Sequence, residues 1–237
     1  MGNNDESNRS GMGMEAVICD FVRSPFHRAH KGALSNSRPE DMVSAVVREA
    51  ISRSGIEGDS VEDLLLGCAY PEGVQGLNLG RMATYLSGLP TSVPGVTTNR
   101  LCGSSMQIAH TAAGAIKMGS GELFICAGVE TMSMVQRGGW NRDLHPQIEQ
   151  DFPSAYIAMG LTAENLAEKY SISRLAQEEF AFNSHRKAIT AQSKGFFSDE
   201  LTPIPTPDGD VSIDGCIRET TLDKMATLSP AFTENGT

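Results

Sequence analysis

One cysteine, Cys102, has the sequence surroundings of a nucleophile. The segment TTNRLCGSSMQIAH (97–110) places it between a β-branched run and a helix-forming run, followed directly by Gly103 and two serines. A strand that ends before Cys102 and a helix that begins there would put the thiol near unpaired helix N–H groups and the positive end of the helix dipole. These surroundings favour the thiolate, which is the form that attacks acyl carbons. The alternative is a buried, inert cysteine.

Alternating runs of strand and helix type are expected to position Cys102. Pro39 and Gly55 mark the start and the stop of the first helix, since proline is favoured at the first and glycine just after the last helical position. Strands are predicted at 15–22, 61–70, 94–100 and 122–130, and helices at 37–55, 77–88 and 102–121. Because these strands lack polar alternation and are separated by helices, we expect a layered α/β fold whose mixed sheet is mainly parallel.

The pattern changes after residue 130. Residues 133–156 have the composition of a loop, and two helices are predicted to follow. These helices cover 162–170 and 173–195, with Thr162 and Ser173 as their expected N-caps. Residues 200–221 then combine prolines, Asp-Gly turns and short β runs. The region from 131 to 225 is therefore predicted to be an inserted α+β loop domain.

Composition excludes several classes of function. The chain has 19 Lys and Arg against 29 Asp and Glu, a net charge of -10, and no basic cluster suited to nucleic acid. Its scattered cysteines contain no C-x-x-C pair, so we expect a reducing compartment and neither a disulfide framework nor a metal site. No apolar run approaches the ~20 residues of a membrane span. Residues 1–14 are polar and predicted to be a disordered leader, and the expected location is the cytoplasm.

Cys102 needs a general base, and the histidines do not supply one convincingly. His110 follows it on the same predicted helix, but at ~1.5 Å per residue the two are separated by ~12 Å along the axis. The remaining histidines are predicted to have surface roles: His27, His30, His145 and His185.

Several ordered motifs resemble one enzyme family. They are DFVRSPFHRAHKGAL, GCAYPEGVQGLNLGRMA, GLPTSVPG, VTTNRLCGSSMQ, ICAGVETMSMV, MGLTAENLAEKYSISRLAQEEFAFNSHRKA and GCIRETTLDKMATLSPAF. Together they cover essentially the whole chain after the leader. They resemble the degradative 3-ketoacyl-CoA thiolases of fatty-acid β-oxidation.

This resemblance implies roles for three residues. Cys102 matches the cysteine that takes up the acyl group. Arg218, in GCIRETT, matches the arginine that packs along the adenine of coenzyme A, and Met159, in AMGLTAEN, matches a methionine near the acyl and pantetheine end. Biosynthetic members often carry histidine before that Met-Gly pair, where this chain has Ala158. The resemblance therefore favours the degradative branch.

Family members continue for ~150 residues with motifs that this sequence lacks. Those motifs carry an asparagine (N-E-A-F), a histidine (G-H-P) and a second cysteine (C-x-G-x-G), which the resemblance assigns to oxyanion stabilisation and proton transfer. Without them, we expect the chain alone to be an inactive N-terminal portion of a thiolase. The base that Cys102 needs would then lie in the absent segment.

The resemblance also implies domains and partners. The expected divisions are a leader (1–14), an α/β domain with the nucleophile (15–130), a CoA-binding loop domain (131–225) and the start of a return to the core (226–237). Coenzyme A and 3-ketoacyl-CoA would be substrates, with no cofactor or metal. A homodimer or tetramer is expected, with residues 94–121 at the interface, and a partner in a β-oxidation complex is also predicted. The alternatives are a biosynthetic acetoacetyl-CoA thiolase and a non-catalytic CoA-binding or dimerising module.

Overall fold

The structure, a computed structural model, describes residues 15–237, so the predicted leader lies outside the described residues. Contacts divide the chain into two compact units. The first extends to Trp140 and also contains Glu200–Gly215, whereas the second consists of Asn141–Asp199 and Cys216–Thr237. The predicted division of the chain by function, with boundaries after residues 14, 130 and 225, stays a prediction.

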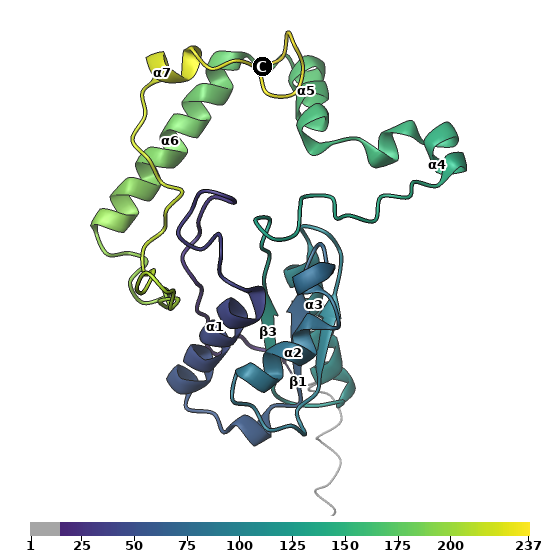
Figure 1. Cartoon of the computed structure of the whole chain (residues 1–237), viewed down its shortest axis with the longest axis vertical. Coiled ribbons are helices and arrows are strands. Elements are labelled where there is room, and N and C mark those ends of the chain that lie inside the picture. The colour runs from purple at the N-terminus through teal and green to yellow at the C-terminus, as the bar shows by residue number, and fades with distance from the viewer. Residues whose placement is uncertain (1–14) are drawn as a thin grey trace, which may run out of the picture. The chain divides into compact units, whose positions relative to one another are not determined.

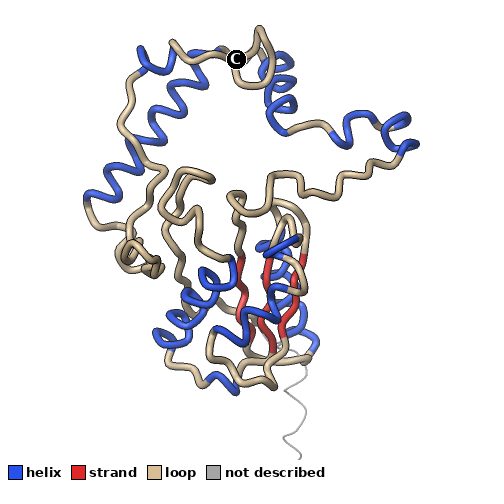
Figure 2. The backbone as a smooth tube through the Cα atoms, in the orientation of Figure 1, coloured by secondary structure: helices blue, strands red, loops and turns tan. Residues whose placement is uncertain are grey.

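The first unit is built on a three-stranded parallel sheet (Figure 2). Its strands are β1 (Asp63–Gly67), β2 (Gly95–Thr98) and β3 (Phe124–Gly128), in the order β2-β1-β3. The register places Gly67 beside Thr98 on one side and Gly128 on the other. All three strands therefore end at one edge of the sheet, and the predicted parallel α/β architecture is confirmed.

Helices cover both faces of this sheet (Figure 1). They are α1 (Pro39–Ser54), α2 (Leu79–Leu86) and α3 (Ser104–Met118). Leu64 and Leu66 of β1 pack with α1 and α2, whereas Leu65 packs with Ile108 and Ala112 of α3. Successive strand residues point to opposite faces of the sheet. Because helices cover both faces of β1, every residue in its centre is buried, and this is why the run of leucines is unbroken.

The ends of α1 follow the sequence prediction. Pro39 is the first helical residue, where its missing N–H leaves no donor unpaired. Gly55 ends the helix in the left-handed conformation with φ 65°, which glycine adopts without a side-chain penalty. Two short 3-10 turns complete the connections, at Gly58–Ser60 and Gly73–Gln75.

The predicted strand at 15–22 is wrong. These residues form no strand pairing in the described part of the chain, and Val17, Ile18 and Phe21 are exposed. An apolar run becomes a strand only where a neighbouring strand accepts and donates its backbone hydrogen bonds. The first backbone bridge comes later, between Arg23 and Leu201.

Arg23 holds Glu200–Gly215 in the first unit. Its Nε donates to Glu200 at 2.7 Å, and its two terminal nitrogens donate to the Asp214 carboxylate at 2.8 and 2.9 Å. The Phe26 N–H also donates to Asp214, at 2.8 Å. Two parallel hydrogen bonds between a guanidinium and a carboxylate fix their relative orientation as well as their distance. This contact therefore determines where Glu200–Gly215 packs in the first unit.

The second unit is mainly helical. It contains α4 (Pro146–Asp151), α5 (Met159–Tyr170), α6 (Arg174–Ser193), α7 (Leu222–Ala226) and a 3-10 turn at Pro153–Tyr156. No helix among residues 15–237 is long and apolar enough to cross a membrane.

Of the two predicted N-caps, one is confirmed. The Ser173 side chain accepts from Ala176 N at 3.2 Å and caps α6. Thr162 is not a cap, because α5 starts earlier, at Met159. Its hydroxyl instead donates to the Ala158 carbonyl at 3.4 Å, a common alternative for threonine inside a helix.

Candidate active site

Cys102 lies at the carboxyl edge of the sheet, between β2 and α3. β2 ends at Thr98, and α3 begins at Ser104 with Gly103 as its N-cap. Cys102 therefore comes just before the helix rather than in its first turn, and it is exposed. Open α/β sheets place their ligands at this edge. The thiol thus lies at the predicted strand-to-helix junction, but the helix begins two residues later than the sequence predicted.

A hydrogen-bonded turn fixes the backbone around Cys102. Gly103 N donates to Arg100 O at 3.0 Å, and Ser104 N donates to Leu101 O at 3.1 Å. The Ser104 hydroxyl accepts from Arg100 N at 2.9 Å and donates to Leu101 O at 2.5 Å. Leu101 has φ 47°, an uncommon conformation for a side chain of this size. Strained backbone of this kind is concentrated at functional sites.

Two glycines let α3 lie directly against the strand ends. A Cβ atom on Gly67, the last residue of β1, would lie 2.6 Å from Ser105 N. A Cβ atom on Gly128, the last residue of β3, would collide with the Ser105 hydroxyl. Any larger residue at either position would displace the first turn of α3, and with it Cys102.

Within the described residues of the first unit, no hydrogen bond joins a histidine ring to the Cys102 Sγ. His27 accepts from Ala33 N at 3.2 Å and bonds Ile213 O at 3.0 Å, which is a structural role. His110 lies on α3 and is exposed. The described residues also contain no group of three or more His, Cys, Asp and Glu that could hold a metal. What the site can do alone is present a nucleophile.

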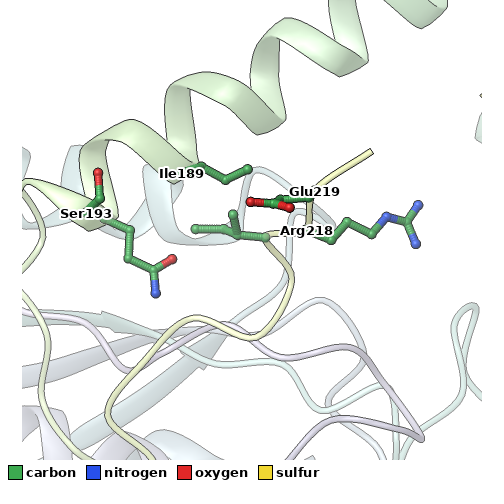
Figure 3. A pocket seen from close by; sticks show the side chains of 6 residues that line it. Ile189, Ser193, Arg218 and Glu219 are labelled. Atoms are coloured by element: carbon green, nitrogen blue, oxygen red, sulfur yellow. The ribbon is translucent and has the colours of Figure 1, made fainter. Parts of the chain in front are cut away.

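Arg218 and Met159 belong to the second unit, whereas Cys102 belongs to the first. Arg218 lines an open pocket between α6 and the segment before α7, together with Ile189, Gln192, Ser193, Ile217 and Glu219. Figure 3 shows its guanidinium extending away from the other labelled side chains. Met159 is the first residue of α5 and is 66% exposed. Both side chains are accessible to a ligand.

Comparison with known proteins identifies the family. The model of the thiolase N-terminal domain matches residues 16–237. The chain belongs to the thiolase family. It is 37% identical to a 3-ketoacyl-CoA thiolase of Bacillus subtilis over 94% of this chain and 61% of that protein. It is 41% identical to a 3-ketoacyl-CoA thiolase of Serratia proteamaculans over 93% of this chain and 59% of that protein.

A solved thiolase structure supports the fold. The crystal structure of the Bacillus anthracis acetyl-CoA acetyltransferase matches with a TM-score of 0.80 and 34% identity, covering 94% of this chain and 60% of the other. The chain therefore spans about 60% of the length of the relatives it matches.

The sequence prediction missed two residues at the same edge of the sheet as Cys102. Cys68, directly after β1, is buried, and its Sγ lies 3.9 Å from Glu130 Oε1. Burial, followed by the Glu130 charge, raises the pKa of the Cys68 thiol to about 12. The available signal was positional, because Cys68 and Glu130 lie toward the carboxyl ends of two runs predicted to be strands, 61–70 and 122–130. Parallel strands bring such residues to the same edge.

We expect Cys102 to be the first of the five cysteines to react with iodoacetamide. Cys102 is exposed at a helix N-terminus, whereas Cys68 remains a protonated thiol at neutral pH. Cys126 is also exposed, but desolvation raises the pKa of its thiol, whose Sγ lies 3.8 Å from Ile108 O. Peptide mass spectrometry after limited alkylation measures the order. Faster labelling of Cys19 or Cys126 would reject the assignment, and Cys68 should react last.

Proposed function

We propose that this chain is the nucleophile-bearing part of a degradative 3-ketoacyl-CoA thiolase, an acyltransferase of fatty-acid β-oxidation. The observation that carries the proposal is the exposed Cys102 thiol between β2 and α3, at the edge where α/β proteins bind ligands. Relatives named 3-ketoacyl-CoA thiolase, at 37% and 41% identity, support the substrate class. A polypeptide that joins this chain to a thiolase C-terminal half is called the extended thiolase below.

In the proposed reaction, the Cys102 thiolate adds to the keto carbon of a 3-ketoacyl-CoA. The bond between that carbon and its neighbour on the thioester side breaks, and its electron pair leaves as the enolate of acetyl-CoA, which takes up a proton. The remaining acyl group is then a thioester on Cys102. The thiolate of a second CoA attacks this thioester, which yields the shortened acyl-CoA and restores the Cys102 thiolate. The C-terminal half of the extended thiolase would supply the groups that transfer protons and the donors that stabilise the oxyanion.

Coenzyme A is proposed to bind the second unit as a substrate, with no further cofactor. Arg218 would lie along the adenine, since a planar guanidinium stacks on aromatic rings. Ile189 and Ile217 provide apolar surface beside it. Met159 would lie near the pantetheine and acyl end, where a polarisable thioether suits a thioester. Gly160, directly after it, lies against the Phe232 ring.

Replacing Arg218 by alanine is expected to weaken CoA binding by about twofold to fivefold, the range of an exposed cation–π contact. Arg218→Lys should resemble the alanine variant, because it keeps the charge but loses the planar group. Titration calorimetry with CoA measures both. Glu219→Ala, in the same pocket, is the control and should bind CoA no more weakly than the parent chain. An unchanged dissociation constant for Arg218→Ala would reject the adenine contact.

A homodimer, or a tetramer built from it, is part of the proposal. β2 is an edge strand of the described sheet, and Val96 within it is 39% exposed. A strand edge that has no neighbouring strand in the described part of the chain and carries an exposed valine is suited to a second copy of the chain. The cytoplasm is the proposed location, and another β-oxidation enzyme is a proposed partner.

A biosynthetic thiolase is the second candidate. The solved relative is titled an acetyl-CoA acetyltransferase, whereas the sequence relatives above are named 3-ketoacyl-CoA thiolases. Turnover of acetoacetyl-CoA and of longer 3-ketoacyl-CoA by the extended thiolase separates the two. The degradative assignment predicts that longer substrates are cleaved with at least the efficiency of acetoacetyl-CoA. Activity restricted to acetoacetyl-CoA would favour the biosynthetic enzyme.

A further inference from the structure

The Glu130 carboxylate continues the hydrogen bonding between β1 and β3 beyond the end of their backbone pairing. Val129 N, one residue past the end of β3, donates at 3.1 Å to the carbonyl of Gly67, the last residue of β1. One step further along, Ala69 N donates to the Glu130 side chain, with a distance of 2.7 Å to Oε2. A carboxylate therefore takes the place that a strand carbonyl would have, and it is a stronger acceptor.

Gln75 completes the connection and is itself fully buried. Its Nε2 donates to Glu130 Oε1 at 2.6 Å and to Tyr70 O at 2.7 Å. Its Oε1 accepts from Thr131 N at 2.6 Å. The loop after β1 and the segment after β3 are thus held together by one carboxylate and one amide. Buried polar groups that are all paired make a rigid connection.

The first turn of α3 rests on the two strand ends that this connection joins. Gly67 and Gly128, the paired last residues of β1 and β3, both lie in contact with Ser105. Cys102 precedes Ser105 by three residues and is held in the hydrogen-bonded turn of residues 99–104. A change in spacing between the strand ends would therefore move the start of α3 and the thiol before it.

We propose that Glu130 is a positioning residue for Cys102. It holds the ends of β1 and β3 at the spacing that seats the start of α3, and so places the thiol at the helix N-terminus. This inference rests on the proposed function of Cys102 as the nucleophile. Gln75 fixes the orientation of the carboxylate through the bond to Oε1.

Glu130→Gln tests the inference, because the amide cannot accept from both Ala69 N and Gln75 Nε2. The glutamine NH2 group would face either Ala69 N or Gln75 Nε2, both of which are donors. One of the two hydrogen bonds that join the ends of β1 and β3 is therefore lost. Alkylation of Cys102 by iodoacetamide, followed by mass spectrometry in the full 237-residue chain, is expected to slow by about threefold to tenfold as the thiol loses its place at the helix N-terminus. Gly67→Ala should have a similar effect, since its new Cβ displaces Ser105 directly.

The matched control is Asp214→Asn, in the same unit. Asp214 also accepts from one backbone N–H, of Phe26, and from a side chain, of Arg23. This variant should leave the alkylation rate of Cys102 within twofold of the parent chain. Cys68 serves as the internal folding probe, because burial is a larger cause of its protection than the neighbouring Glu130 charge, and Glu130→Gln leaves that burial in place as long as the unit stays folded.

The inference requires slower alkylation of Cys102 in Glu130→Gln while Cys68 stays protected. An unchanged Cys102 rate overturns it. Labelling of Cys68 together with Cys102 also overturns it, since Glu130 would then only stabilise the unit. Alkylation of Cys102 does not depend on catalysis. Failure of this inference therefore says nothing about the proposed thiolase reaction, which is tested separately by turnover of the extended thiolase.

Discussion

Replacing Cys102 by alanine is expected to abolish thiolysis by the extended thiolase, with a loss of about 10⁴-fold or more. The reason is that the alanine variant can form no acyl-enzyme, and removal of a covalent nucleophile costs at least this much in well-studied hydrolases. CoA-dependent consumption of acetoacetyl-CoA measures the rate. The affinity for CoA should change little, because Arg218 and Met159 belong to the second unit.

Cys126→Ala is the matched control for this substitution. Cys126 also lies near α3, with its Sγ 3.8 Å from Ile108 O, but it is in the middle of β3 rather than at the strand edge. Its removal should reduce the rate by less than about tenfold, as expected for a packing residue. Turnover that survives in Cys102→Ala and disappears in Cys126→Ala would reverse the two assignments.

The 237-residue chain tested alone is expected to show no measurable thiolysis. Cys102 is exposed, but no histidine is hydrogen-bonded to it among residues 15–237. Carbon–carbon cleavage needs an oxyanion donor and proton delivery to the leaving enolate, and removal of one oxyanion donor alone costs about 100-fold or more. The assay is consumption of a 3-ketoacyl-CoA in the presence of CoA, and addition of a thiolase C-terminal half should restore turnover.

Turnover by the chain alone that is lost in Cys102→Ala would contradict this expectation. It would mean that residues 15–237 already contain a base that acts on the thiol. His110, on the helix that Cys102 precedes, would then be the first residue to replace, with His27 as the control because both of its ring nitrogens have backbone partners.

Local chemistry made much of the first unit predictable. Proline and glycine mark the two ends of α1, and the unbroken run of leucines in β1 indicates a strand covered on both faces. The run at 15–22 is equally apolar but finds no strand partner among the described residues. The difference between the two runs lies in their neighbours rather than in their own composition. Pairing of this kind depends on contacts far along the chain, which a local pattern does not contain.

The candidate site was predictable only in part, for the same reason. A cysteine between a strand pattern and a helix pattern is a local signal, and it indicated Cys102. Glu130 and Gln75 meet only when β1 and β3 lie side by side, so nothing near either residue indicates their contact. The attachment of Glu200–Gly215 to the first unit through Arg23 is likewise a contact between distant parts of the chain.

The central claim is that Cys102 carries the acyl group, and trapping of that intermediate tests it most directly. The extended thiolase is mixed with acetoacetyl-CoA in the absence of free CoA, quenched in acid, digested and analysed by mass spectrometry. We predict one acetyl group on the peptide that contains Cys102, and its loss when CoA is added before the quench. An acetyl group on another cysteine, or continued turnover with Cys102 unmodified, would contradict the claim.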